Sequence, residues 1–236
     1  MRLGGYVPCS LNDFPGKLAA VVFTQGCNWR CPWCHNPSLV YAEQFTSPLP
    51  APNVLPRLEQ RRGRLDGVVI TGGEPTIQPG LGSFLAAVKT LGFATKLDTN
   101  GSHPEVLRTL LDSSLVDFVA MDLKAPWARY AEAAGTAVNT DALGETLALL
   151  RQRGIPHQLR TTRWPSLAAS DCEAISCLAA GSPHVWQEYR ITTARGQLVP
   201  AASWGSEAAI RPGSPIEANP ACQPPARGHL SECSAR

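Results

Sequence analysis

Three cysteines lie close together in the segment Thr24 to Asn36, which reads TQGCNWRCPWCHN. Their spacing, Cys27-x3-Cys31-x2-Cys34, is too tight for ordinary core cysteines. Soft thiolates select zinc, Cu(I) or an iron–sulfur cluster. A structural zinc site uses four protein ligands, usually as two separated pairs, and no second pair follows at such a spacing. A [4Fe–4S] cluster normally takes four thiolates, so these three would leave one iron open to a substrate or cofactor.

Two other interpretations of these cysteines carry less weight. A zinc site could add His35, but His35 directly follows Cys34, and both side chains could not easily reach one tetrahedral ion. A disulfide framework would need more than the 8 cysteines found in 236 residues. The first residues, MRLGG, also lack the apolar core of a signal peptide. We therefore favour the cluster.

The composition predicts one globular core in the cytoplasm, where thiolates stay reduced. A chain of 236 residues fits one α/β domain, and 44% apolar with 17% charged residues supports a sizeable core. The formal charge of +2 predicts neither nucleic-acid nor membrane binding. No run approaches the roughly 18 apolar residues that a membrane span needs.

Buried strands and helices alternate along most of the chain, which predicts an α/β fold with a parallel sheet. Residues 1–19 are too rich in turn formers to predict a long element. We expect strands at 19–24, 66–71, 94–98, 117–123, 156–162 and 184–191, and helices at 54–62, 82–91, 103–113, 140–153 and 170–180. Six such units would form either a partial (β/α)6 barrel or an open parallel sheet.

Polar motifs follow the carboxyl ends of three of these strands, where ligands gather in α/β proteins. They are GGEP at 72–75, DTNG at 98–101 and DLK at 122–124. Glycines let a backbone approach closely, and a carboxylate pairs with an ammonium group. Two acids at adjacent strand ends would repel each other, so they need a shared cation or a basic partner such as Lys124. The alternative interpretations are a tight turn for the GGEP motif, helix-capping roles for the two Asp residues, and a surface position for Lys124.

The C-x3-C-x2-C loop resembles the signature of the radical S-adenosylmethionine (SAM) enzymes. The resemblance implies a partial (β/α)6 TIM-like barrel and a [4Fe–4S] cluster on Cys27, Cys31 and Cys34. In that family the open iron chelates the amino and carboxylate groups of SAM. Reductive cleavage then gives a 5′-deoxyadenosyl radical that abstracts a hydrogen. The GGEP motif strengthens this resemblance, and by it Gly72, Gly73 and Glu74 would hold the SAM amino group.

The DTNG and DLK loops resemble those of activating enzymes that install glycyl radicals. By that resemblance Asp98, Thr99 and Asp122 are candidate ligands of a monovalent cation beside SAM, and Lys124 is a candidate contact to the SAM carboxylate. Arg160, on the fifth expected strand, either reaches SAM or forms a structural ion pair, and Gln187 on the sixth is a weaker candidate.

Trp33 stands at an aromatic position that the family places near the adenine. A hydrophobic plug over the cluster is its other interpretation, and the two roles are compatible.

The segments SLNDFPGK and FTQGCNWRCPWCHNP resemble the activating proteins of anaerobic (class III) ribonucleoside-triphosphate reductase, over roughly residues 3–190. The partner implied is that reductase, through one glycine in a peptide loop, with a flavodoxin- or ferredoxin-type electron donor. Two rivals remain: a radical SAM enzyme acting on a small molecule, such as a deazapurine-precursor synthase, and a non-catalytic metal or iron–sulfur scaffold.

The remaining cysteines and the C-terminal segment receive no firm role. Cys9, Cys172, Cys177, Cys222 and Cys233 are scattered. We expect buried or idle thiols here, against the alternative of an auxiliary cluster built on 172 and 177 with the last pair. Residues 211–236 are rich in Pro, Ser and Gly, so we expect a core domain at 1–210 followed by a mobile tail.

Overall fold

The computed structural model describes residues 1–189, without the side chains of residues 51 and 52. One curved sheet organises this part of the chain, with the strand order β3-β1-β2-β4-β5-β6-β7-β8. The strands are β1 (Arg2–Ser10), β2 (Ala19–Thr24), β3 (Leu49–Pro50), β4 (Gly67–Gly72), β5 (Ala94–Thr99), β6 (Phe118–Asp122), β7 (His157–Arg163) and β8 (His184–Glu188).

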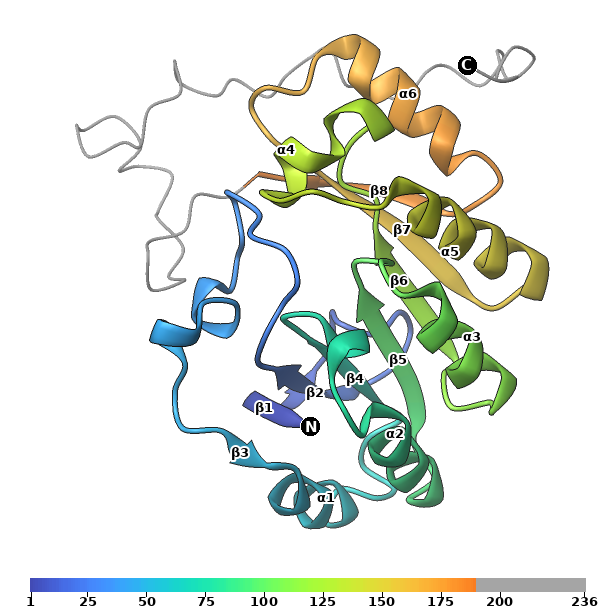
Figure 1. Ribbon diagram of the computed structural model, residues 1–236. Helices are drawn as coiled ribbons and strands as arrows, with labels where there is room; N and C mark the ends of the chain where they lie inside the picture. The colour runs from blue at the N-terminus through green and yellow to red at the C-terminus, as the bar shows by residue number, and fades with distance from the viewer. Residues whose placement is uncertain (190–236) are drawn as a thin grey trace.

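Helices cover the outer side of this sheet (Figure 1). They are α1 (Ala51–Glu59), α2 (Leu81–Thr90), α3 (Pro104–Asp112), α4 (Tyr130–Ala134), α5 (Thr140–Arg153) and α6 (Ala169–Ala179). Short 3-10 turns lie at η1 (Pro37–Leu39), η2 (Ala42–Gln44), η3 (Pro75–Ile77) and η4 (Trp127–Arg129). The predicted helices and strands are all present within a few residues of the predicted ends, whereas α4 had no prediction.

β2, β4, β5, β6, β7 and β8 pair in parallel, as predicted, and the middle residues of β2, β4, β5 and β6 are buried on both faces. In β2, Ala20 and Val22 join the large core between sheet and helices, while Ala19 and Val21 face a small inner cluster with Phe14 and Val69. Successive side chains of a strand point to opposite faces, so a strand buried on both faces reads as a continuous apolar run. The result is the mixed α/β sheet of a partial TIM-like barrel.

The prediction that residues 1–19 contain no long element was wrong. β1 is a nine-residue strand that pairs antiparallel with β2, and β3 pairs with β1 in the same sense. The register is irregular between Val7 and Ser10, and this interval contains Pro8. β3 pairs only with Arg2 and Leu3, so Pro8 removes no hydrogen bond from that side. Turn formers are tolerated at bulges and edges, which explains why composition misled the prediction.

The parallel register places the loops that carry the motifs at one end of the sheet. Thr24 of β2 pairs with Gly72 of β4, and Asp122 of β6 pairs with Arg160 of β7. Within the described residues, the helices are all too short or too polar to cross a membrane. Ile191, the expected domain boundary near Arg211 and the expected tail lie outside the described residues.

Candidate active site

The cysteine loop starts at the end of β2 and is anchored on α4. The backbone N–H of Arg30 donates to the carbonyl oxygen of Ala134 at 2.7 Å. Trp29, only 3% exposed, packs edge to face on Tyr130 with ring centroids 5.7 Å apart. The loop is therefore positioned by protein contacts that need no metal.

The GGEP turn lies directly against the cysteine loop. The N–H of Gly73 donates to Thr24 O at 3.0 Å, and the N–H of Glu74 donates to Gly26 O at 2.9 Å. A Cβ on Gly73 would lie 2.0 Å from Gly26 O, and Gly72 has a φ of +112°. Only glycine fits both conditions, so the close backbone approach expected from the motif is directed at the cysteine loop.

Glu74 ties this turn to the end of β5. Its carboxylate is 1% exposed, and Oε1 accepts from Thr76 N (3.0 Å), Thr76 Oγ1 (2.5 Å) and Thr99 Oγ1 (2.7 Å). Oε2 accepts from Asn100 N at 2.7 Å. Burial raises the pKa of Glu74, although these donors act in the opposite direction. Because Oε2 has one protein donor, it keeps the capacity to accept another.

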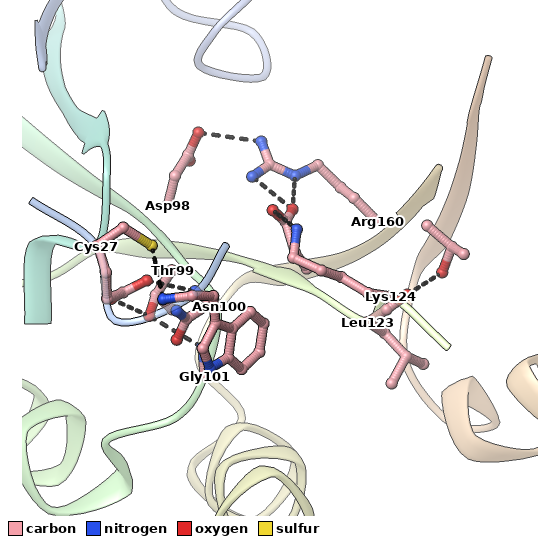
Figure 2. A network of polar contacts seen from close by, with 12 residues as sticks. Cys27, Asp98, Thr99, Asn100, Gly101, Leu123, Lys124 and Arg160 are labelled. Carbon is pink, nitrogen blue, oxygen red and sulfur yellow. Dashed lines mark hydrogen bonds and ion pairs between the residues drawn. The ribbon is translucent and has the colours of Figure 1, made fainter. Parts of the chain in front are cut away.

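A second link joins the cysteine loop to β5 through amide side chains. Asn100 Nδ2 donates to Asn28 Oδ1 at 2.8 Å, and Asn28 Nδ2 donates to Ser102 Oγ at 2.9 Å. Figure 2 shows Cys27 beside Thr99 and Asn100 as a consequence. The DTNG motif thus holds the cysteine loop by hydrogen bonds and also contributes Asp98 to the cavity.

Charged side chains of alternating sign connect β5, β6 and β7 (Figure 2). Lys96 Nζ binds Asp98 Oδ1, and Arg160 Nη1 binds Asp98 Oδ2 at 3.0 Å. Arg160 also binds Asp122 Oδ1 through Nε at 3.0 Å and Nη2 at 2.9 Å. Lys124 Nζ donates to Asp122 Oδ2 at 3.0 Å. We call these five residues the charged network.

Ionisation of this network follows from its pairing. Burial alone would raise the pKa of Asp122, but the charges of Arg160 and Lys124 outweigh burial and hold that pKa well below its ordinary value. Burial opposes charge on Lys124 and Arg160, yet the neighbouring acids raise both pKa values above the ordinary range. Asp122, Lys124 and Arg160 are all charged at neutral pH.

One cavity of about 300 Å³ collects the residues predicted from the sequence. Its lining includes Cys27, Cys31, Trp33, Cys34, His35, Gly72, Gly73, Glu74, Asp98, Thr99, Asp122, Lys124, Arg160 and Gln187. These residues come from segments up to 160 positions apart, from Cys27 to Gln187. The structure therefore brings together every candidate site residue, while the role of each remains a prediction.

The three thiols of the cysteine loop are half-buried and share this cavity. Burial raises all three pKa values, that of Cys27 to about 12, against a hydrogen bond from Trp29 N to Cys27 Sγ of 3.4 Å. Among the described residues, no three His, Cys, Asp or Glu side chains converge on the position of a single ion. Three thiols on one loop that line one cavity are the donor set that three irons of a [4Fe–4S] cluster would take.

Trp33 belongs to an aromatic stack that the sequence did not predict. Its ring stacks on Trp164 with centroids 4.6 Å apart and an interplanar angle of 18°. The guanidinium of Arg129 lies over Trp164 at 4.5 Å from the centroid, and Trp164 Nε1 donates to Lys124 O at 3.2 Å. The stack fixes the orientation of Trp33 at the cavity and joins it to the DLK loop.

Several positioning residues had little or no signal in the sequence. Tyr130 is fully buried; its hydroxyl accepts from Lys124 N (3.1 Å) and donates to Asp122 O (3.2 Å). A Cβ on Gly135 would lie 2.1 Å from Arg30 O, so α4 must end in glycine to accept the cysteine loop. Lys96 did leave a signal: it shares a face with Asp98 at a spacing of two residues in the strand ATKLDT.

Of the other cysteines, the three that lie within residues 1–189 take no part in this cavity. Cys9 is exposed on β1, whereas Cys172 and Cys177 lie on α6 and do not line the cavity. Both Cys172 and Cys177 are disulfide-bonded, so the expectation of idle thiols was wrong at these two positions. Sulfurs held in disulfides are not thiolate ligands, which argues against the alternative of an auxiliary cluster on Cys172 and Cys177. Cys222 and Cys233, the other pair of that alternative, lie outside the described residues.

Comparison with known proteins places this cavity in a family. Residues 21–166 match the family model of the radical SAM superfamily. A Methanocaldococcus jannaschii protein named as a glycyl-radical enzyme activating enzyme is 37% identical over 144 residues, covering 55% of this chain and 53% of the relative. The pyruvate formate-lyase-activating enzyme of Clostridium pasteurianum is 34% identical over 132 residues, covering 52% of each chain.

A second kind of relative appears beside these activating enzymes. The 7-carboxy-7-deazaguanine synthase of Neisseria meningitidis is 34% identical over 113 residues, covering 48% of this chain and 47% of the relative. The chain thus spans about half the length of the relatives it matches. Among solved structures, Streptococcus suis SuiB bound to S-adenosylmethionine superposes with a TM-score of 0.61 at 18% identity, covering 76% of this chain and 42% of SuiB, which shows a shared fold.

Proposed function

Because the chain belongs to the radical SAM superfamily, we propose that it activates a glycyl-radical enzyme. In this proposal a hydrogen atom is removed from one glycine Cα of a partner protein. The observation that carries it is the convergence of the cysteine loop, GGEP turn and charged network on one cavity. A scaffold that only stores metal would need none of the groups beyond the cysteines.

Each group of residues receives a distinct role. Cys27, Cys31 and Cys34 would hold a [4Fe–4S] cluster whose fourth iron is left for SAM. When bound, the cluster supplies the electron that cleaves SAM to methionine and a 5′-deoxyadenosyl radical. Glu74 offers Oε2, which has one protein donor, to the SAM ammonium group. The backbone of Gly73 would approach the SAM amino group closely, and Gly72 forms the turn that precedes Gly73.

Two basic side chains and one aromatic side chain complete the SAM site. Lys124 and Arg160 are charged, line the cavity and would pair with the SAM carboxylate. Trp33 would lie against the adenine, held in orientation by Trp164. Gln187 of β8 also lines the cavity and is the weakest candidate.

The substrate class follows from relatives and from the shape of the sheet. Two of the relatives described above are named as activating enzymes for glycyl-radical proteins. Within residues 1–189 the sheet is not closed, because β3 and β8 stand at opposite ends of the strand order. An open barrel suits a protein loop as substrate. We propose class III ribonucleoside-triphosphate reductase as the partner, on the SLNDFPGK and CHNP segments, with a flavodoxin- or ferredoxin-type electron donor in the cytoplasm.

A deazapurine synthase is the second candidate function, because a 7-carboxy-7-deazaguanine synthase is similar over 113 residues. The His35-Asn36-Pro37 segment after the third cysteine favours the activase over this candidate.

The test begins with anaerobic reconstitution using iron and sulfide, followed by reduction in the presence of SAM. About four irons per chain, a SAM-dependent change in the EPR signal and release of 5′-deoxyadenosine would support the SAM chemistry. A glycyl-radical doublet after addition of the anaerobic reductase from the same cell would support the partner. Formation of 7-carboxy-7-deazaguanine would favour the second candidate. Tightly bound zinc without deoxyadenosine would refute both.

A further inference from the structure

The resemblance to glycyl-radical activating enzymes implies a monovalent cation on Asp98, Thr99 and Asp122, and the donor atoms here do not fit one. The two oxygens of Asp98 are bound by Lys96 and Arg160. The two oxygens of Asp122 are bound by Arg160 and Lys124. A cation at either acid would therefore lie beside a positively charged side chain that already binds the same carboxylate, and the two positive charges would repel each other.

The side chain of Thr99 is no better prepared to coordinate a cation. Its hydroxyl donates to Glu74 Oε1 at 2.7 Å and accepts from Gly101 N at 3.1 Å. The side chain is 4% exposed and held from both sides. The Thr99 hydroxyl thus links the GGEP turn to the end of β5 through its hydrogen bond to Glu74.

The charge count of the network points the same way. Asp98 and Asp122 contribute two negative charges, while Lys96, Lys124 and Arg160 contribute three positive charges, which leaves +1. Without Lys96 the sum is zero, and one bound monovalent cation would restore +1. The lysine ammonium therefore supplies the charge that a cation would otherwise bring.

Lys96 is well placed to take the position of a monovalent cation. It lies in the middle of β5, two residues before Asp98 on the same face, and is 3% exposed. A buried ammonium is costly unless it is paired, and Asp98 is the pairing acid. Unlike the guanidinium of Arg, an ammonium is a compact point charge, which resembles an alkali cation in charge and shape.

We propose that the Lys96 ammonium replaces the monovalent cation in this chain. By neutralising Asp98, Lys96 keeps the strand-end acids from repelling an incoming carboxylate and leaves Lys124 and Arg160 to receive it. Lys96 is a positioning residue, since it acts through Asp98. The consequence for SAM rests on the function proposed above, whereas the replacement of a cation can be tested on the cluster-free protein.

The test compares potassium, sodium and tetramethylammonium chlorides at equal ionic strength. For the cluster-free wild type, we expect the same thermal unfolding midpoint in all three salts. Lys96→Met should unfold at a lower temperature in tetramethylammonium and recover part of the loss in potassium or sodium. Lys96→Gln, which keeps a polar tip, is the second variant. Lys89→Met is the matched control, because it removes a lysine paired with Asp117 (2.7 Å) outside the cavity and should show no dependence on the cation.

Equilibrium binding of SAM to the reconstituted protein gives the second readout. Lys96→Met should bind SAM about tenfold more weakly in tetramethylammonium than wild type and regain affinity in potassium. A wild type whose unfolding midpoint or SAM affinity rises specifically with potassium or sodium would overturn the proposal, whether or not the variants fold. Normal SAM affinity of both variants in tetramethylammonium would also overturn it. A wild type that binds no SAM in any salt contradicts the proposed function, while the unfolding measurements still test the cation replacement.

Discussion

Arg160 stands opposite Asp122 in the register of β7 and β6, and two of its guanidinium nitrogens bind the same carboxylate oxygen, at 3.0 and 2.9 Å. Because paired residues in neighbouring strands point to the same face, this contact is set by the sheet itself. The third nitrogen is free to reach Asp98, which is two strands from β7. Contacts within the protein thus align the strand-end acids.

Asp122→Asn should destabilise the protein at neutral pH, and the loss should shrink in acid. Arg160 and Lys124 lower the folded pKa of Asp122 below its unfolded value of 3.8, so the unfolded state takes up the proton more readily. The ionised acid therefore stabilises the fold above about pH 4, and this contribution is lost as the pH falls through the folded pKa. Urea unfolding should give a difference of about 3 kcal/mol at pH 7.

The matched control for this prediction is Asp112→Asn. Asp112 pairs with Arg153 at the surface, with 48% of each side chain exposed, so its loss should cost less than about 1 kcal/mol. If the difference between wild type and Asp122→Asn stayed constant from pH 7 to pH 3, the argued pairing would be incorrect.

Replacing any one of Cys27, Cys31 or Cys34 with Ala should abolish the cluster and with it SAM cleavage. Each supplies one of the three thiolates at the cavity, and the loop offers no replacement ligand of the same kind. Iron and sulfide analysis after reconstitution measures the loss. Cys9→Ala removes an exposed thiol on β1 and should retain about four irons. Full cluster content in a Cys31→Ala protein would refute the ligand assignment.

Gly73→Ala should displace the cysteine loop even though no ligand is removed. The added methyl would lie 2.0 Å from Gly26 O, so one of the two backbones must move. We expect a stability loss of about 1–3 kcal/mol together with reduced cluster content. Gly144→Ala, inside α5 with no atom within 4 Å of the new Cβ, should instead raise stability by up to about 1 kcal/mol. Equal behaviour of the two variants would contradict this account.

Tyr130→Phe should lower the free energy of unfolding by about 1–3 kcal/mol, because it leaves the Lys124 N–H without its acceptor and keeps the ring on Trp29. Weaker SAM binding should accompany the loss, since the hydroxyl holds the DLK loop. Tyr6→Phe is the contrasting change: among the described residues the buried Tyr6 hydroxyl has no hydrogen-bond partner, so its removal should leave stability unchanged or improved. Chemical denaturation of both variants provides the comparison.

Patterns of neighbouring residues predicted the features of the fold and of the cavity that depend on short segments of the sequence. Apolar runs predicted the parallel strands, and strand-end motifs predicted the lining of the cavity, because spacing along the chain becomes position at one sheet edge. β1 escaped prediction because a bulge accommodates Pro8. Tyr130 and Gly135 escaped because their importance arises from contacts with Trp29 and Arg30, about 100 residues earlier, and no pattern within α4 announces them.

The hydrogen bond between Arg30 N and Ala134 O has a consequence for maturation of the enzyme. In small zinc-dependent domains the metal supplies the folding free energy, so the empty protein is unfolded. Here the loop that would receive the cluster is fastened to α4 by this hydrogen bond and by the packing of Trp29 on Tyr130. We therefore expect these contacts to keep the loop in position before iron and sulfide arrive, so that a chain which loses its cluster can take up a new one.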